Sequence, residues 1–237
     1  MIIGIIGHGE IGSALSKIYK EEGYECRIWD PFLELHDDMS GVDILNICIP
    51  YSENFNVIVT DYIRTIQPAY TVIHSTVAPG TTKAIGGKIC HSPCRGLHPN
   101  LDVGIRTFLK YIGSDHADVG YEYQRHLMDM RIESYVCADS KTTEYAKLLD
   151  TTYYGMCIAF HNDVQKLCKR EDMHFTEVMT LYNDTYNEGY VALGKSNVVR
   201  PVLYASDRIG GHCVTSNADI LGNYFDSEAI DLIKKYK

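Results

Sequence analysis

Short apolar runs and helical patterns alternate along the first part of the chain. Apolar runs typical of buried strands cover residues 1–6, 24–29, 42–49, 70–74, 88–91, 107–112 and 132–137. Stretches with apolar residues at helical spacing lie between them, at 13–19, 54–66 and 117–128. Such an alternation predicts a doubly wound parallel sheet with helices on both faces.

The pattern changes near residue 140. Residues 144–168 form one long helical pattern without proline, and a second helix is predicted from about 175 to 190. The sequence therefore predicts two domains, an α/β domain over residues 1–139 and a smaller all-helical domain over residues 140–237. Long apolar helices in so small a domain need a partner surface, so we expect a homodimer through residues 140–237.

A glycine-rich segment follows the first predicted strand and opens the first predicted helix. In the dinucleotide-binding fingerprint, Gly7 makes the tight turn, Gly9 lets the backbone approach a pyrophosphate, and Gly12 lets helix and strand pack closely. The helix N-terminus then presents free N–H groups and a partial positive charge to the phosphates. The segment predicts a Rossmann domain whose cofactor contacts include Gly7, His8, Gly9, Glu10, Ile11 and Gly12.

An acidic residue ends the second predicted strand. Gly23 is a natural helix C-cap, and Asp30 stands at the end of the strand that follows. A carboxylate at this position accepts hydrogen bonds from a ribose 2′-OH and repels a 2′-phosphate, which favours NAD over NADP. Strand alternation from Asp30 directs Arg27, the nearby cation, to the other face.

The charge of the chain narrows the classes of partner. The 237 residues carry a net charge of −9, and the isoelectric point is near 5.5. An acidic surface argues against nucleic acid or an anionic membrane as a partner and leaves a small molecule as the expected substrate. The apolar N-terminus lacks a basic flank, and no run of 18 apolar residues occurs, so we expect a soluble, cytoplasmic protein.

The cysteines point to the same compartment. The chain has 8 cysteines scattered through predicted strands and helices, which is typical of reduced, buried thiols. Cys90 and Cys94 lie close together with His91 and His98 nearby, but no second Cys or His pair follows at zinc spacing. We therefore expect no metal site.

Three further segments carry a resemblance to a known family. Residues 74–82 read His-Ser-Thr-Val-Ala-Pro-Gly-Thr-Thr, residues 144–148 read Glu-Tyr-Ala-Lys-Leu, and residues 209–213 read Ile-Gly-Gly-His-Cys. Together with the glycine turn, their order and separation resemble the UDP-glucose/GDP-mannose dehydrogenase family. The resemblance covers this chain but only the first two thirds of a family member, which continues with a second Rossmann-like domain that holds the nucleotide-sugar.

The resemblance implies roles for the matching residues. Cys213 would be the nucleophile that adds to an aldehyde intermediate, Lys147 would stabilise an alkoxide or oxyanion, and Thr76 would order water or substrate near the nicotinamide. Two further positions are expected to contact the cofactor, Pro50 at the end of the third strand and Ser75 beside Thr76.

Four positions depart from the family pattern. Asn217 stands where an aspartate is expected, Thr151 replaces an asparagine, Tyr204 replaces a second lysine, and Cys94 replaces a glutamate. The missing carboxylates and lysine are hard to reconcile with the four-electron oxidation of a UDP-sugar. A two-electron alcohol oxidation needs only the cofactor, a proton acceptor and a cation for the alkoxide.

Alternatives remain for several residues. Cys213 could be a structural thiol in a turn, Lys147 a solvated lysine and Thr76 a cap. Residues 96–100 also resemble the Gly-x-His-Pro loop of prephenate dehydrogenases, in which His98 would take a proton from the substrate. The leading hypothesis is an NAD-dependent oxidoreductase acting on a small hydroxylated substrate. The alternatives are an NAD-binding protein without turnover, as a degenerate or split enzyme, and a prephenate-dehydrogenase-like enzyme.

Overall fold

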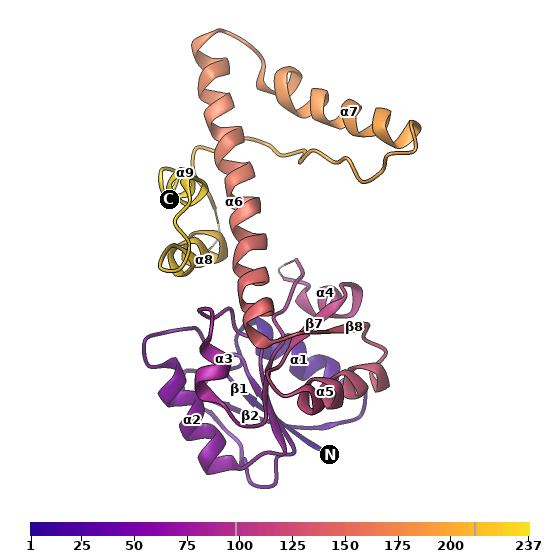
Figure 1. Cartoon of the computed structure of the whole chain (residues 1–237), viewed down its shortest axis with the longest axis vertical. Coiled ribbons are helices and arrows are strands. Elements are labelled where there is room, and N and C mark those ends of the chain that lie inside the picture. Colours follow the sequence, from indigo (N-terminus) through magenta and orange to yellow (C-terminus); the bar gives the residue numbers. More distant parts are fainter. Residues whose placement is uncertain (98, 211) are drawn as a thin grey trace. The chain divides into compact units, whose positions relative to one another are not determined.

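The chain divides into two compact units. The computed structural model describes residues 1–97, 99–210 and 212–237. One unit is Met1–Lys147 and the second is Leu148–Lys237. In its described residues the first unit contains all the strands, and the second contains helices and extended segments only (Figure 1).

An eight-stranded sheet forms the centre of the first unit, in the order β3-β2-β1-β4-β5-β6-β7-β8. Neighbouring strands are parallel except β3 with β2 and β7 with β6. The β6–β7 junction is a single pair, His91 with Gly113. The strands are β1 (Ile2–Ile6), β2 (Glu25–Asp30), β3 (Leu35–His36), β4 (Ile44–Ile47), β5 (Tyr70–Ile73), β6 (Ile89–His91), β7 (Lys110–Gly113) and β8 (Ser134–Cys137).

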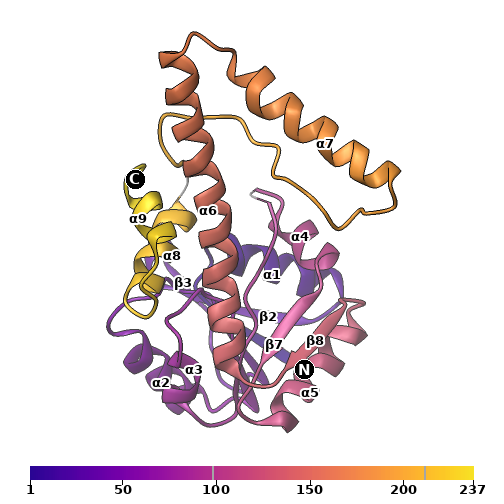
Figure 2. The same cartoon turned by 45° about the horizontal axis from the view of Figure 1, so that its top comes forward.

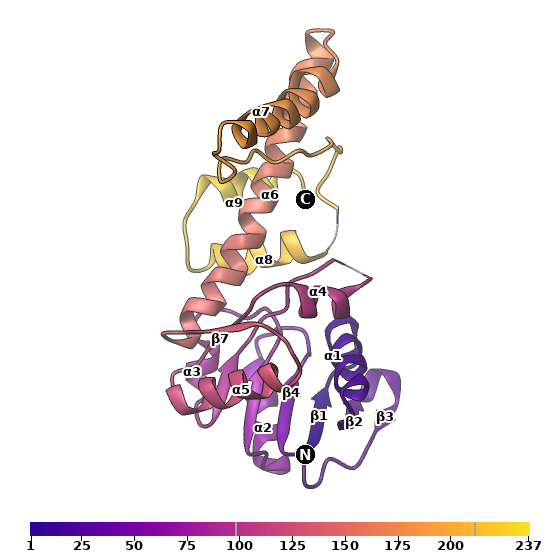
Figure 3. The same ribbon diagram turned by 90° about the vertical axis from the view of Figure 1, so that its right-hand side faces the viewer.

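Helices cover both faces of this sheet (Figure 3). One buried cluster joins the strands to α1, α4 and α5, and a second joins them to α2 and α3. Ile3 and Ile5 enter the first cluster, whereas Ile6 enters the second, as the two-residue period of a strand requires. The helices are α1 (Glu10–Glu21), α2 (Phe55–Ile66), α3 (Thr81–Ile85), α4 (Leu101–Thr107) and α5 (Ala117–Asp129), and η1 (Pro31–Leu33) is a short 3-10 helix.

The first helix ends where the sequence predicts. Gly23 has a φ of +82°, a left-handed conformation that glycine adopts without strain. The N–H of Gly23 donates to the Lys20 carbonyl at 3.1 Å, and the N–H of Tyr24 donates to the Tyr19 carbonyl at 2.9 Å. This Schellman arrangement stops the helix and starts β2.

The helical unit is built on α6 (Ser140–Arg170), of which residues 148–170 belong to it. It also contains the π-helical segment η2 (Thr176–Thr180), α7 (Leu181–Ala192), α8 (His212–Gly222) and α9 (Glu228–Lys234). Residues of α6, α8 and α9 share one buried cluster (Figure 2). A Cβ at Gly155 would lie 2.4 Å from a Val214 methyl group, so this glycine permits close packing of α8 on α6.

The structure confirms the predicted fold class, a doubly wound Rossmann sheet followed by an all-helical part. It corrects three local predictions. Thr107 ends helix α4 rather than beginning a strand, and β7 starts at Lys110. The predicted helix at 175–190 is divided between η2 and α7, and Cys213 lies in the first turn of α8 rather than in a loop. No helix in the described part of the chain is long and apolar enough to cross a membrane.

Candidate functional site

The glycine turn between β1 and α1 has the geometry of a phosphate cradle. Gly7 has a φ of +87° and donates its N–H to the Trp29 carbonyl at 2.9 Å. A Cβ at Gly12 would lie 1.9 Å from the Gly7 carbonyl oxygen, so only glycine lets α1 approach the turn. A Cβ at Gly9 would meet nothing within 4 Å, and this residue caps α1 without a side-chain hydrogen bond. The turn thus leaves open space above Gly9 and uncapped amides at the helix N-terminus, which fits a pyrophosphate.

Asp30 ties the end of β2 to the glycine turn. Its Oδ2 accepts a hydrogen bond from the His8 N–H at 2.7 Å. Its Oδ1 accepts from the N–H groups of Phe32 and Leu33 at 3.0 and 3.3 Å. These backbone donors, His8 first, lower the pKa of Asp30, so it is ionised at neutral pH. A carboxylate has about four acceptor sites, and three of them are taken here, so Oδ2 can still accept from one ribose hydroxyl.

His8 contributes a neutral ring to the turn. Burial is the main cause that lowers its pKa, and the charge of Lys20 adds to the effect. Its Nε2 is buried and has no hydrogen-bond partner among the described residues. The imidazole therefore offers a hydrogen bond to a ligand at the turn but not a positive charge.

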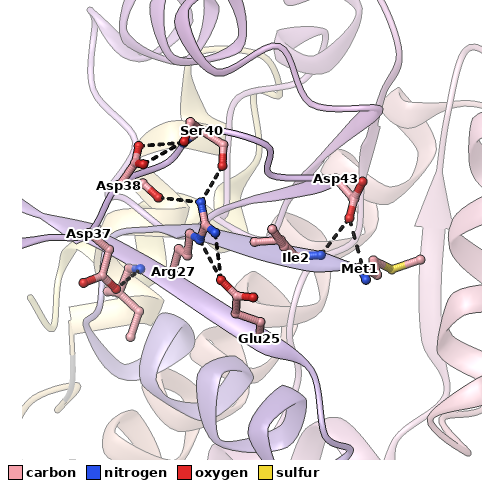
Figure 4. A network of polar contacts seen from close by, with 9 residues as sticks. Met1, Ile2, Glu25, Arg27, Asp37, Asp38, Ser40 and Asp43 are labelled. Carbon is pink, nitrogen blue, oxygen red and sulfur yellow. Dashed lines mark hydrogen bonds and ion pairs between the residues drawn. The ribbon is translucent and has the colours of Figure 1, made fainter.

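Arg27 is held by Glu25 and by the segment at residues 38–40 (Figure 4). Its Nε donates to Glu25 Oε1 at 2.9 Å, and its Nη1 donates to the Asp38 carbonyl at 3.0 Å and to the Ser40 carbonyl. A guanidinium with these partners is not directed at the end of β2, where a 2′-phosphate would sit. The Asp30 carboxylate is therefore the charge that an adenosine ribose would meet at the end of β2. A negative charge at this point favours NAD over NADP.

The loop after β5 carries the next two predicted cofactor contacts. Ser75 is buried, and its hydroxyl donates to the Ile49 carbonyl at 2.6 Å. This bond joins the ends of β5 and β4, so Ser75 shapes the site with a hydroxyl that already has a partner. Thr76 is half-buried, and Pro50 is exposed beside the end of β4. These two residues have surface to offer a ligand.

A buried clamp fixes this loop to the start of α6 within the first unit. Glu144 is fully buried and accepts hydrogen bonds from the N–H groups of Gly80 at 2.5 Å and Thr82 at 2.8 Å. Burial raises the pKa of Glu144, and the two amides oppose that shift. In the sequence Glu144 stands out only as the first residue of the Lys147 motif, and no local signal indicates its positioning role.

His91 forms the second half of the clamp. Its Nε2 lies 3.1 Å from the Ser75 carbonyl oxygen, and its Nδ1 lies 2.8 Å from Thr143 Oγ1. Burial lowers the pKa of His91 to about 3, so the ring is neutral at physiological pH. A carbonyl only accepts, so Nε2–H donates to Ser75 and Nδ1 accepts from Thr143.

Lys147 lies three residues past Glu144 on α6 and is half-buried. Its positive charge is one of the causes that lower the pKa of His91, which places it near the clamp. The clamp thus orients the helix turn that carries Lys147. The predicted proton acceptor, His98, lies outside the described residues.

Cys94 occupies an interior position in the sheet unit. It is buried, with its Sγ 3.6 Å from Lys110 Nζ and 3.9 Å from His74 Nδ1. Lys110 is also buried, and its ammonium donates to the Ser92 carbonyl at 2.8 Å. Burial, and then the charge of Lys110, holds the pKa of His74 well below its ordinary value. The Cys94 thiol is therefore a buried structural group. It stands at the position of the expected glutamate but does not take over the role of a carboxylate there. In the part of the chain that the structure describes, no group of three His, Cys, Asp or Glu side chains could hold a metal ion.

The helical unit holds the remaining predicted residues. Cys213 is an exposed free thiol in the first turn of α8. Asn217, one turn further on, is buried and donates from Nδ2 to Thr151 Oγ1 at 3.1 Å. The two residues that replace the family's aspartate and asparagine thus contact each other. Tyr204 is 77% exposed.

The fold and the first crossover together define a class of protein. Parallel strands in the order β2-β1-β4-β5-β6, a glycine turn at the first crossover and an acid at the end of β2 are features of a Rossmann dinucleotide-binding domain. Sequence comparison adds a narrower relationship. The chain is 26% identical over 180 residues to the UDP-N-acetyl-D-mannosamine dehydrogenase of Methanocaldococcus jannaschii, covering 70% of this chain and 35% of that protein.

Other matches agree on the fold. The chain is 25% identical over 150 residues to the NADPH-dependent reductive aminase of Aspergillus oryzae, covering 56% of this chain and 49% of that protein. The UDP-D-ManNAc dehydrogenase structure from Pyrococcus horikoshii aligns with 100% of this chain and 68% of its own, with a TM-score of 0.80 at 17% identity. Mycobacterium tuberculosis 3-hydroxyisobutyrate dehydrogenase aligns with 99% of this chain and 92% of its own, with a TM-score of 0.73 at 12% identity.

These matches confirm the resemblance to UDP-sugar dehydrogenases that the sequence motifs indicated. The chain spans about a third of the length of its curated UDP-N-acetyl-D-mannosamine dehydrogenase relatives, 35% and 38% in the two matches. A comparison with models of known protein families found no match.

Proposed function

We propose that the chain is an NAD-dependent oxidoreductase that removes a hydride from a small hydroxylated substrate. The glycine turn carries the proposal, because its open space at Gly9 and its contact between Gly12 and Gly7 fit a bound pyrophosphate. Asp30, next to the turn, supplies the carboxylate for the ribose. The sequence relatives support the reaction class, since they are two dehydrogenases and a reductive aminase.

When bound, NAD supplies a hydride acceptor, and the chain supplies orientation and proton transfer. Glu10, Ile11 and Gly12 would present the first amides of α1 to the diphosphate. Pro50, Ser75 and Thr76 would border the nicotinamide half of the cofactor. The division into a cofactor domain at 1–139 and a substrate domain at 140–237 remains part of this proposal.

The catalytic roles follow the resemblance. Lys147 would stabilise the alkoxide while the hydride leaves, with Thr76 ordering the hydroxyl or a water. His98 would take the hydroxyl proton, and Cys213 would act as a nucleophile only if the aldehyde is oxidised further. The buried Glu144 supports Lys147 by fixing the start of α6.

Activity with purified full chain tests this proposal. NAD and a panel of hydroxy acids, sugar phosphates and UDP-sugars should yield NADH, and NADH should bind more tightly than NADPH. Lys147→Ala should lower turnover while NADH binding is unchanged, and Cys213→Ser should do so only with a substrate that is oxidised beyond the aldehyde. The matched variants Lys141→Ala and Cys137→Ser should retain activity. Binding of NADH without turnover on any substrate class would reject the oxidoreductase.

A second candidate is an NAD-binding protein without turnover. The hydrogen bond between Asn217 and Thr151 favours it, because a neutral pair replaces the carboxylate and amide of the related enzymes. The exposed Tyr204 replaces a cation as well. Such a chain would be a degenerate dehydrogenase or one half of a split enzyme. Recovery of UDP-sugar oxidation on addition of a separate sugar-binding chain would identify the split form.

We also propose that the chain forms a homodimer through the helical part and works in the cytoplasm. Large apolar side chains on its helices are exposed, among them Tyr153, Tyr154 and Tyr182. All eight cysteines are free thiols, as expected in a reducing compartment. Sedimentation should give twice the chain mass, and a monomer at all concentrations would reject the dimer.

A further inference from the structure

A cavity in the helical unit has the features of a small-molecule site separate from the glycine turn. It measures about 430 Å³, within the range usual for ligand pockets, and is lined by α6, η2, α7, the segment at 200–201 and α9. Every lining residue belongs to Leu148–Lys237. The cavity is therefore a feature of one compact unit.

The wall is largely apolar and includes soft side chains. Met156 and Phe160 come from α6, Met179 from η2 and Leu232 from α9. Methionine side chains adapt to the shape of a ligand, and their sulfur makes favourable contacts with an aromatic ring. This lining favours a ligand with an aromatic body.

His161 gives the cavity an unmatched acceptor. It lines the cavity and is 2% exposed. Its Nδ1 lies 2.6 Å from the Cys157 carbonyl oxygen, which only accepts, so Nδ1 carries the proton. In the neutral ring Nε2 then holds a lone pair, and this buried atom has no partner among the described residues. A buried acceptor left without a donor is unfavourable, so a ligand hydroxyl that donates to it would stabilise the bound state.

Arg200 gives the cavity an unmatched donor. Its backbone is held in place, since its N–H donates to Asn187 Oδ1 at 2.8 Å and its carbonyl accepts from Asn187 Nδ2 at 2.8 Å. Its guanidinium carbon lies 3.5 Å from the centre of the Tyr186 ring. Nη1 is buried and has no partner within the described part of the chain. A fixed, partly desolvated guanidinium of this kind favours a carboxylate.

We propose that this cavity binds an aromatic hydroxy acid. Its ring would contact Met156, Phe160 and Met179, its carboxylate would accept from Arg200 Nη1, and its hydroxyl would donate to His161 Nε2. The site differs from the dinucleotide site in chemistry and in residues, and it requires no nicotinamide cofactor. Its occupancy is therefore independent of whether the chain is an active oxidoreductase.

Methionine-methyl NMR of the full chain, with no cofactor added, tests the proposal. Mandelate is the probe, because it combines a ring, a carboxylate and a neighbouring hydroxyl. Of the seven methionines, Met156 and Met179 line the cavity, and Met→Leu variants assign their signals. We expect mandelate to shift these two signals with a Kd of about 1 mM or lower, and to leave the Met1 and Met39 signals unchanged.

Two matched ligands separate the polar contacts. Phenylacetate lacks the hydroxyl and 1-phenyl-1,2-ethanediol lacks the carboxylate, and each should bind roughly tenfold more weakly than mandelate. Arg200→Gln should weaken mandelate and phenylacetate but not the diol. His161→Gln should remove the advantage of mandelate over phenylacetate, and the exposed control Arg170→Gln should change nothing.

Several outcomes would overturn the proposal. Mandelate and the diol binding equally would exclude a carboxylate site at Arg200. Shifts of Met156 and Met179 that depend on protein concentration rather than on mandelate would show that a second copy of the chain fills the cavity. If Arg200→Gln fails to fold, the ranking of the three ligands on the unchanged chain decides the question.

Discussion

Two regions differ in how closely they follow the related dehydrogenases. One is the glycine turn of the sheet unit, and the other is the contact of α6 with α8 in the helical unit. At the turn every expected residue is present, and Gly12 contacts the Gly7 carbonyl so closely that no other residue fits. At the second region Asn217 and Thr151 replace two expected polar groups and hydrogen-bond to each other. Backbone packing leaves the turn no freedom to change, whereas a side-chain pair can be replaced if both members change together.

Substitutions in the turn should have the largest effect. Gly12→Ala places a methyl group against backbone atoms, so we expect a loss of about 5 kcal/mol in unfolding free energy together with loss of NADH binding. Urea unfolding and NADH fluorescence measure the two. Gly9→Ala is the matched control, since its methyl group meets only open space. It should weaken NADH binding and leave the unfolding free energy nearly unchanged. Full NADH affinity in Gly9→Ala would show that the pyrophosphate does not bind at this turn.

The clamp at the start of α6 comes next. Glu144→Ala leaves the buried N–H groups of Gly80 and Thr82 without an acceptor, which should cost about 4 kcal/mol of stability. Glu144→Gln retains one acceptor oxygen and should lose less. Thermal unfolding compares the two variants with Glu171→Ala, an exposed control. Equal stability of Glu144→Ala and the control would show that water satisfies these amides.

Acid should destabilise the clamp in a defined interval. The pKa of His91 is lowered from 6.5 to about 3, so between these values the unfolded chain binds a proton that the folded chain excludes. The contribution of His91 to the unfolding free energy is therefore at its maximum above pH 6.5. It falls as the pH decreases, by roughly 3 kcal/mol at pH 4.

His91→Gln should flatten this part of the pH profile in urea unfolding. The exposed His174→Gln should leave the profile as it is. A slope that survives in His91→Gln at full size would assign the proton uptake to other buried histidines, such as His126, whose pKa is lowered to about 4 by burial.

The smallest expected effect is on activity, from a substitution at the contact of α6 with α8. Asn217→Asp restores the carboxylate that the related enzymes carry. The Thr151 hydroxyl donates to the Leu148 carbonyl at 3.0 Å, so it can donate to this carboxylate only by giving up that bond. We expect a few-fold gain in NADH production, with stability changed by about 1 kcal/mol or less. Steady-state kinetics beside Asn223→Asp, on the residue following α8, measures the gain. An equal gain in both variants would trace it to net charge rather than to position 217.

Local signals predicted most of the sheet unit from the sequence. Alternating apolar runs located the strands, and the position of Asp30 after the glycine turn predicted its place in the cradle. Short helices were missed, because α3 and α4 contain only 5 and 7 residues and show too little periodicity. The predicted strand also included Phe108 and Leu109, which connect α4 to β7. Apolar character alone does not distinguish a strand from such a connection.

Contacts between distant residues could not be predicted in the same way. Glu144 and Gly80 are 64 positions apart, and Asn217 and Thr151 are 66 apart. Tertiary packing alone brings these groups together, and a single sequence carries no periodic signal for it. The resemblance named Thr151 and Asn217 as departures, but only the structure shows that they are partners.

The junction between β6 and β7 has a consequence for the dynamics of the sheet. One residue pair joins the two strands, and the buried Lys110 ammonium adds bonds to the Ser92 and Pro93 carbonyls across the same line. Because so few backbone hydrogen bonds cross this junction, we expect β7 and β8 to separate locally from β6 without disturbing the strands next to the glycine turn. Amide protons of β7 and β8 should then exchange as one cooperative group, faster than those of β1 and β4.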